Sequence, residues 1–257
     1  MDQVVPQLVC RASIAQTIGK RAEQQDRCRV SDPAMLQTHG LLAVLADGMG
    51  GMAGGGAFAE LAVNAMMDAF AALQPTENPA LDLLRCYHAA EARLPELPFE
   101  ENEGGSTVVA VLLRRNTLHF LTVGDSRLYL CRGGGLIQLN REQTLGHVLD
   151  ERAALGLYPW ADAQTNLRRH ALFNFFGAKP PKPPDRNITP ISLRPDDRIV
   201  LMSDGVFGTL TDQALLPLIL QDAAISGQAM IDAVLEAQHP KQDNGSVILL
   251  LCEHAEG

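Results

Sequence analysis

Apolar runs of strand length recur along the chain, and short polar turns separate many of them. Runs of this length that end at Gly, Asn or Asp are typical of β-strands. We predict strands over residues 8–15, 26–30, 40–46, 106–113, 117–123, 127–131, 136–139, 198–202 and 244–252. Because short turns join the strands between residues 106 and 139, we expect these strands to pair antiparallel.

Longer stretches rich in Ala, Leu and Met predict helices. They cover residues 57–73, 80–94, 144–155, 211–221 and 227–238, and Thr211 is a candidate N-cap. An acidic loop is expected at 95–105, and the run KPPKPPD at 179–185 predicts an extended, exposed connector. No internal repeat or boundary divides the 257 residues, so we expect a single α+β domain.

The composition is that of an ordinary soluble globular protein, with 46% hydrophobic and 20% charged residues. A net charge of −9 argues against a nucleic-acid partner, because phosphate contacts require a basic face. The five cysteines form no Cys-x-x-Cys pair, which favours free thiols in a reducing compartment. No signal-peptide pattern and no apolar run of about 18 residues is present, so we expect a cytoplasmic protein without a membrane partner.

One stretch, LLAVLADGMGGMAGGG at residues 41–56, delivers a single carboxylate from an apolar run into a glycine loop. A buried lone charge is costly unless it is paired or binds a metal. We therefore interpret Asp47 as a metal ligand. An Asp-Gly step by itself is a common turn, so this interpretation depends on other aspartates in equivalent places.

Four further aspartates stand at strand ends. Asp125 and Asp204 follow predicted strands, as Asp47 does, whereas Asp26 and Asp243 precede strands. In antiparallel sheets the end of one strand lies beside the start of its neighbour, so all five can meet at one edge. Such carboxylates repel one another unless cations are bound. Oxygen ligands without nearby His or Cys select Mg²⁺ or Mn²⁺, and two such ions are suited to attack on a phosphate.

Arg21 is the candidate phosphate ligand. It lies in the loop before Asp26, and a guanidinium can bind two phosphate oxygens at once. A solvated surface arginine is the alternative interpretation.

With these residues in place, the chain resembles the metal-dependent protein serine/threonine phosphatases of the 2C type, the PPM family. The similar blocks occur in order over nearly the whole chain. They are RAEQQD at 21–26, ADGMGG at 46–51, GST at 105–107, VGDSR at 123–127, SDGV at 203–206, and Asp243-Asn244.

The resemblance implies a four-layer α-β-β-α sandwich, with two antiparallel sheets flanked by helices and a flap at about 145–185. It implies two Mn²⁺ or Mg²⁺ ions, with Asp47 bridging both and the Gly48 carbonyl, Asp204 and Asp243 as further ligands. Asp26 would act directly or through water, Asp125 would hold a possible third ion, and Arg21 would hold the substrate phosphate.

The activity implied is hydrolysis of phosphoserine and phosphothreonine in proteins by a metal-activated water. The implied partners are phosphorylated proteins, including a cognate Ser/Thr kinase and its targets, and we expect a monomer.

Two residues depart from the family pattern. Gln25 replaces the Glu before Asp26, which keeps a hydrogen-bond acceptor but loses its charge. Met49 stands where eukaryotic relatives place a histidine proposed as general acid, which indicates a bacterial type.

Two alternatives remain. VLMSDGVFGTL resembles the Asp loop of haloacid-dehalogenase phosphatases, but Met202 occupies the position of their nucleophile. A pseudophosphatase that keeps the fold for binding or sensing is favoured only by Gln25. A nucleotide-binding P-loop is excluded, because no Gly-Lys-Ser/Thr follows the glycines.

Overall fold

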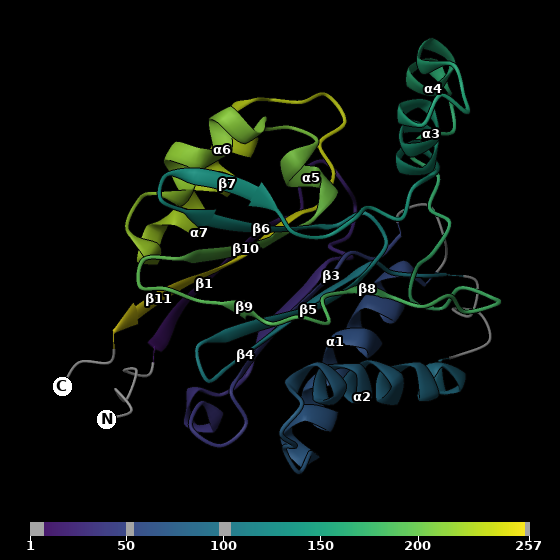
Figure 1. Cartoon of the computed structure of the whole chain (residues 1–257). Helices are drawn as coiled ribbons and strands as arrows, with labels where there is room; N and C mark the ends of the chain where they lie inside the picture. Colours follow the sequence, from purple (N-terminus) through teal and green to yellow (C-terminus); the bar gives the residue numbers. More distant parts are fainter. Residues whose placement is uncertain (1–7, 50–53, 98–103, 255–257) are drawn as a thin grey trace.

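Two antiparallel sheets packed face to face form the centre of the protein (Figure 1). The computed structural model describes residues 8–49, 54–97 and 104–254. The first sheet has the order β1 (Leu8–Thr17), β11 (Gly245–His254), β10 (Arg198–Met202), β6 (Arg127–Arg132), β7 (Gly135–Gln138). The second has the order β2 (Arg27–Val30), β3 (Leu41–Ala46), β4 (Val108–Arg114), β5 (Thr117–Val123), β8 (Asp185–Arg186), and β9 (Ile191–Ser192) also pairs with β5.

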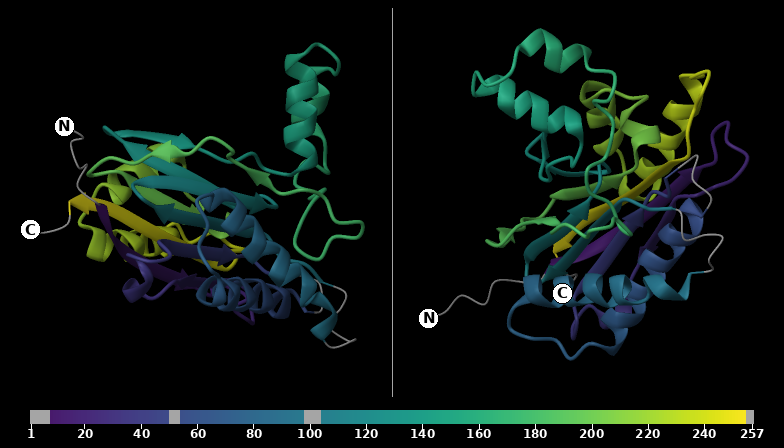
Figure 2. Two further views of the ribbon diagram at one scale, coloured as in Figure 1. Left: turned by 60° about the horizontal axis from the view of Figure 1, so that its bottom comes forward. Right: turned by 90° about the vertical axis from the view of Figure 1, so that its right-hand side faces the viewer.

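Helices cover both outer faces of this sandwich, as expected for a four-layer α+β fold (Figures 1 and 2). The second sheet is covered by α1 (Gly55–Ala72) and α2 (Pro79–Ala92). The first is covered by α5 (Asp204–Phe207), α6 (Asp212–Ile219) and α7 (Ala223–Glu236). Two short 3-10 helices lie at Pro33–Met35 and Leu94–Glu96.

Strand β3 shows why the apolar runs are continuous rather than alternating. Successive side chains of a strand point to opposite faces of the sheet. Leu42 and Val44 pack against α1 and α2, whereas Ala43 and Leu45 pack between the two sheets. Both faces of the strand are therefore excluded from solvent, and all six residues of β3 are buried.

The flap predicted at about 145–185 contains α3 (Leu145–Ala154) and α4 (Trp160–Thr165), which project from the sandwich (Figure 2). Thr144 caps α3 by accepting a hydrogen bond from the His147 N–H. At its base, Gly146 donates to the Arg169 carbonyl over 2.8 Å, and Arg169 forms an ion pair with Asp150 at 2.7 Å. In the Pro-rich run at 179–185, residues 179–183 are exposed as expected, whereas Pro184 and Asp185 are half-buried and Asp185 begins β8.

Several short elements were not predicted from sequence. They are α4, α5, β8, β9 and the two 3-10 helices. Ser203-Asp204-Gly205 was expected simply to end a strand, but Asp204 is the first residue of α5. Residues 50–53 of the glycine loop and residues 98–103 of the acidic loop lie outside the described residues. Within the part that is described, no helix combines the length and apolar character needed to cross a membrane.

Candidate metal centre

The five aspartates singled out from the sequence gather at one end of the sandwich. Burial raises the pKa of Asp47 well above its usual value of 3.8. The negative charges of Asp26, Asp204, Asp125 and Asp243 raise it further, in that order. The other four carboxylates therefore lie within electrostatic range of Asp47, although segments next to strands of both sheets contribute them.

Backbone and hydroxyl contacts hold Asp47 at the end of β3. Its N–H donates to Thr107 Oγ1 over 3.1 Å, and its carbonyl accepts from the Thr107 N–H and from Ser106 Oγ, each over 2.9 Å. Thr107 Oγ1 is also 2.7 Å from Ser126 Oγ. The GST and GDS sequence blocks therefore link the loops that carry Asp47 and Asp125.

Gly48 lies where three backbone segments meet. A Cβ at this position would stand 2.5 Å from the carbonyl group of Gly55 and 2.8 Å from the carbonyl oxygen of Gln25. Any side chain would push these segments apart. The glycine therefore brings the start of α1 and Gln25 close to Asp47.

Asp26 joins the second sheet to the first. Its Oδ2 accepts hydrogen bonds from Ser203 Oγ over 2.8 Å and from Ser246 Oγ over 2.7 Å. Its Oδ1 is buried and has no hydrogen-bond partner. Burial raises the pKa of Asp26, and these hydrogen bonds partly oppose the rise. A buried carboxylate oxygen without a donor, close to other carboxylates, is suited to bind a cation.

Asp204 and Asp125 are also weaker acids than an ordinary aspartate. Burial, followed by the charges of Asp125 and Asp243, raises the pKa of Asp204 to about 7. Burial, followed by the charge of Glu142, raises the pKa of Asp125 to about 6. Both groups bind protons more tightly than an exposed aspartate, because burial and neighbouring carboxylates disfavour the charged form.

Arg21 is placed at this cluster but is already paired. Its guanidinium Nη2 donates to Asp243 Oδ2, while the Asn244 N–H donates to Asp243 Oδ1 over 2.8 Å. The Asn244 side chain holds the loop that carries Arg21. It accepts from the Gln25 N–H over 2.9 Å, and its amide donates to the carbonyls of Ile18 and Glu23.

The donor chemistry of this cluster fits hard divalent cations. The five predicted residues offer carboxylate oxygens, the ligand type that Mg²⁺ and Mn²⁺ prefer. Among the residues that the structure describes, no group of three or more His, Cys, Asp or Glu side chains could hold a metal ion as it stands. The Arg21–Asp243 contact occupies one carboxylate oxygen of the cluster.

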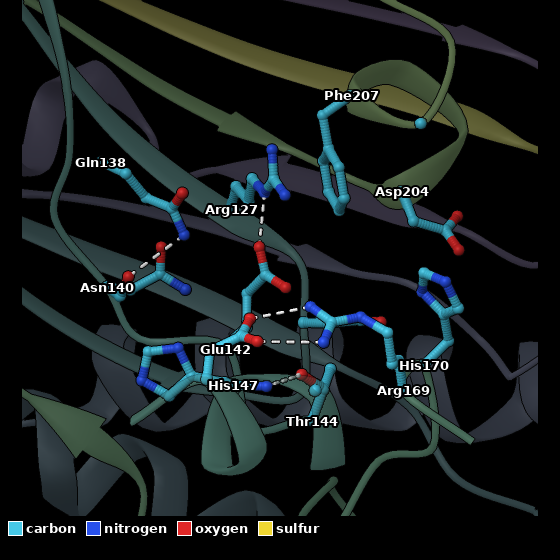
Figure 3. Close-up of a pocket in the computed structure, with 14 residues that line it drawn as sticks. Arg127, Gln138, Asn140, Glu142, Thr144, His147, Arg169, His170, Asp204 and Phe207 are labelled. Atoms are coloured by element: carbon cyan, nitrogen blue, oxygen red, sulfur yellow. Dashed lines mark hydrogen bonds and ion pairs between the residues drawn. The ribbon is translucent and has the colours of Figure 1, made fainter. Parts of the chain in front are cut away.

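A cleft of about 680 Å³ adjoins Asp125 and Asp204 (Figure 3). Its other wall includes Glu142, Arg169 and His170, which belong to the flap or precede it. Arg127 crosses the cleft, forming a 2.6 Å ion pair with Glu142 and lying 4.0 Å above the ring of Phe207.

Sequence reasoning missed Glu142, His170 and Phe207. Only Arg127 had a local signal, since it ends the VGDSR block. Glu142, His170 and Phe207 line the cleft only because the segment at 142–170 and α5 pack beside it.

The model of the family described as Protein phosphatase 2C matches residues 15–238. This chain belongs to the protein phosphatase 2C family. The resemblance seen in the sequence blocks is thereby confirmed. Among curated relatives, the serine/threonine protein phosphatase PstP of Mycobacterium tuberculosis is 30% identical over 216 residues, which cover 81% of this chain. Those residues make up only 40% of the length of PstP.

Another relative of this phosphatase 2C chain matches over more of its own length. The serine/threonine phosphatase stp of Listeria welshimeri is 25% identical over 81% of this chain and 83% of its own.

Solved structures support the fold of the family. The M. tuberculosis PstP/Ppp structure has a TM-score of 0.76 and 26% identity, covering 95% of this chain and 99% of that one. A PstP catalytic domain in complex with two manganese ions has a TM-score of 0.75 and 25% identity, covering 96% and 100%. The predicted architecture of two antiparallel sheets with flanking helices is confirmed.

Proposed function

We propose that this phosphatase 2C chain hydrolyses phosphoserine and phosphothreonine in proteins. The observation that carries the proposal is the gathering of four aspartates around the buried carboxylate of Asp47, one of which, Asp26, has a buried Oδ1 without a hydrogen-bond donor. Family membership and the two manganese ions in the PstP structure support the same reading.

Two Mn²⁺ or Mg²⁺ ions would be held by oxygen ligands alone. Asp47 would bridge them, the Gly48 carbonyl, Asp204 and Asp243 would complete the set, and Asp26 would act directly or through water. Asp125 is a candidate ligand of a third ion beside the flap. When bound, the ions would lower the pKa of a water molecule, so that it could act as a nucleophile toward phosphorus at neutral pH.

Arg21 would bind the phosphoryl oxygens of the substrate. A guanidinium can form two parallel hydrogen bonds to such a group. In the structure this guanidinium contacts Asp243, so we infer that it changes partner when ligands enter the site. A phosphopeptide would then occupy the adjoining cleft between Asp204 and the flap.

We also propose the substrates, the oligomeric state, the location and the domain bounds from this activity. The substrates would be phosphorylated proteins, among them a Ser/Thr kinase and its targets. We propose a monomer that acts in the cytoplasm, with residues 1–257 forming one catalytic domain and 145–185 its flap.

The test is hydrolysis of an aryl phosphate and of a phosphothreonine peptide, with Mn²⁺ and with a chelator. We expect turnover that requires the metal and that Asp47→Asn lowers about 100-fold or more. Asp222→Asn is a matched control, since Asp222 caps α7 and Asn caps a helix equally well. Undiminished turnover in chelator would exclude the two-ion proposal.

A binding module without catalysis is the second candidate. Two observations favour it, namely Gln25 in place of a charged residue and the Arg21–Asp243 contact. Tight binding of a phosphopeptide without turnover at saturating Mn²⁺ would support this alternative.

A further inference from the structure

Two cysteine thiols touch where the first described strand, β1, pairs with the last, β11, three positions or fewer from the Leu8–His254 end of this ribbon. Cys10 of β1 stands directly opposite Cys252 of β11, and their Sγ atoms are 3.2 Å apart. Both thiols are free. Cys10 lies seven residues before Thr17, the last residue of β1, which corresponds to about 23 Å along the strand.

The backbone geometry at this pair suits a covalent bond. The Cys252 N–H donates to the Asp197 carbonyl over 2.9 Å, and the Cys252 carbonyl accepts from the Asp196 N–H over 2.8 Å. Because both groups face β10, Cys10 and Cys252 form a non-hydrogen-bonded pair. Cα atoms in such pairs are about 4.5 Å apart, within the range of about 4.4–6.8 Å that disulfides span.

The two thiols differ in access. Cys252 is fully buried between the sheets, whereas Cys10 is partly exposed. Cys10 also lines a mainly apolar groove of about 400 Å³ with Val30, Pro33, Leu36, Leu41 and Ala223. A small reagent can therefore reach Cys10 first, and Cys252 only through it.

We propose that Cys10 and Cys252 form a modification site at which small-molecule disulfides convert the dithiol into an internal disulfide. The Cys10 thiolate attacks one sulfur of the reagent, forming a mixed disulfide and releasing one thiolate. Cys252 then loses its proton and attacks the Cys10 sulfur, which releases the second thiolate. In total, two protein thiols are oxidised and one reagent disulfide is reduced to two thiols.

The bond would join the first described strand to the last. Strands β1 and β11 pair over ten residues, from Leu8–His254 to Thr17–Gly245. At the other end of the ribbon they lead into Arg21 and out of Asp243. A crosslink that closes almost the whole chain into one loop restricts the unfolded state strongly, so we expect the melting temperature to rise on the order of 5–10 °C.

The experiment treats the whole native chain with oxidised glutathione, then maps the cysteines by alkylation and mass spectrometry. We expect the loss of two hydrogens, a linked Cys10–Cys252 peptide pair, and a higher melting temperature that dithiothreitol reverses. Cys86 and Cys131 are buried and should stay reduced, so they serve as internal controls.

Two variants separate the steps. Cys252→Ser should retain glutathione on Cys10 without a rise in melting temperature, and in Cys10→Ser the buried Cys252 should not react. A stable glutathione adduct on the wild-type chain, a link that uses another cysteine, or no reaction at all would overturn the proposal. The mapping of the wild-type chain decides this even if a variant fails to fold, and it does not depend on phosphatase activity.

Discussion

Arg21 and Asp243 form an ion pair at the edge of the aspartate cluster, so the proposed phosphate ligand neutralises a proposed metal ligand. The two side chains are 46% and 33% exposed, so the pair can open without unfolding the loop. Asn244 positions both partners of the ion pair. It follows Asp243 directly in sequence, and its side chain anchors the loop that carries Arg21. We infer that this salt bridge would couple the proposed metal binding to the proposed phosphate binding.

Arg21→Ala should separate these two roles. Freed from its partner, Asp243 becomes a better cation ligand, so Mn²⁺ should bind several-fold more tightly in a calorimetric titration. Loss of the guanidinium should raise KM for a phosphopeptide about tenfold or more. Arg11→Ala is the control, because Arg11 pairs with Glu253 and is 53% exposed. Equal effects of both substitutions would refute a special role for Arg21.

The stability of the metal-free protein should fall as pH rises. The pKa of Asp204 is about 7 in the folded protein and that of Asp125 about 6, against an ordinary 3.8. Between about pH 4 and 7 the folded state therefore keeps protons that the unfolded chain has released. The free energy of unfolding decreases through this window and reaches its low plateau above it.

Thermal melts in chelator from pH 5 to 8 measure this effect. The melting temperature should decline with pH, and saturating Mn²⁺ should flatten the decline because cations compensate the carboxylates. Asp204→Asn should also flatten it. A melting temperature that rises over this range in chelator would show that the cluster does not control stability.

Gln25→Glu should restore a charged acceptor beside the proposed ions. Gln25 is fixed close to Gly48 and Gly56 by backbone packing, so a side chain of nearly the same shape can be accommodated. We expect the Mn²⁺ concentration for half-maximal activity to fall, with kcat equal or higher. A large loss of kcat in steady-state assays would show that residue 25 does not face the ions.

Gly205→Ala should disturb the site through packing alone. A Cβ on Gly205 would lie 1.9 Å from the carbonyl oxygen of Asn244, so the Asp243-Asn244 segment must move. We expect a loss of about 1–3 kcal/mol in unfolding free energy, together with weaker Mn²⁺ binding. Gly135→Ala is the matched control, since its nearest neighbour would be the Arg132 carbonyl at 3.5 Å. Denaturant unfolding of both variants gives the comparison.

Local pattern was sufficient for the long elements of this protein. The all-apolar run of β3 and the single Asp47 after it predict a buried strand that ends at a polar site, and the structure has both. The strand-edge rule for antiparallel sheets also brought the other four aspartates to the same place. Their roles as metal ligands stay predictions.

Other parts of the site depend on contacts between distant segments, which no local pattern encodes. Asp26 takes its hydrogen bonds from Ser203 and Ser246, far along the chain. The sequence predicts Asn244 as the first residue of the last strand, yet β11 begins at Gly245 and the Asn244 side chain anchors the loop of Arg21. The short helix α5 was missed because its four residues are too few for a helical period to show.

The hydrogen bonds from Ser203 and Ser246 to Asp26 cross from one sheet to the other. Asp47 likewise comes from the second sheet, whereas Asp204 and Asp243 come from the first. Neither half of the sandwich contains the site by itself. Recovery of activity during refolding should therefore report the docking of the two halves, and a species with only one sheet formed would be inert however well ordered that sheet is.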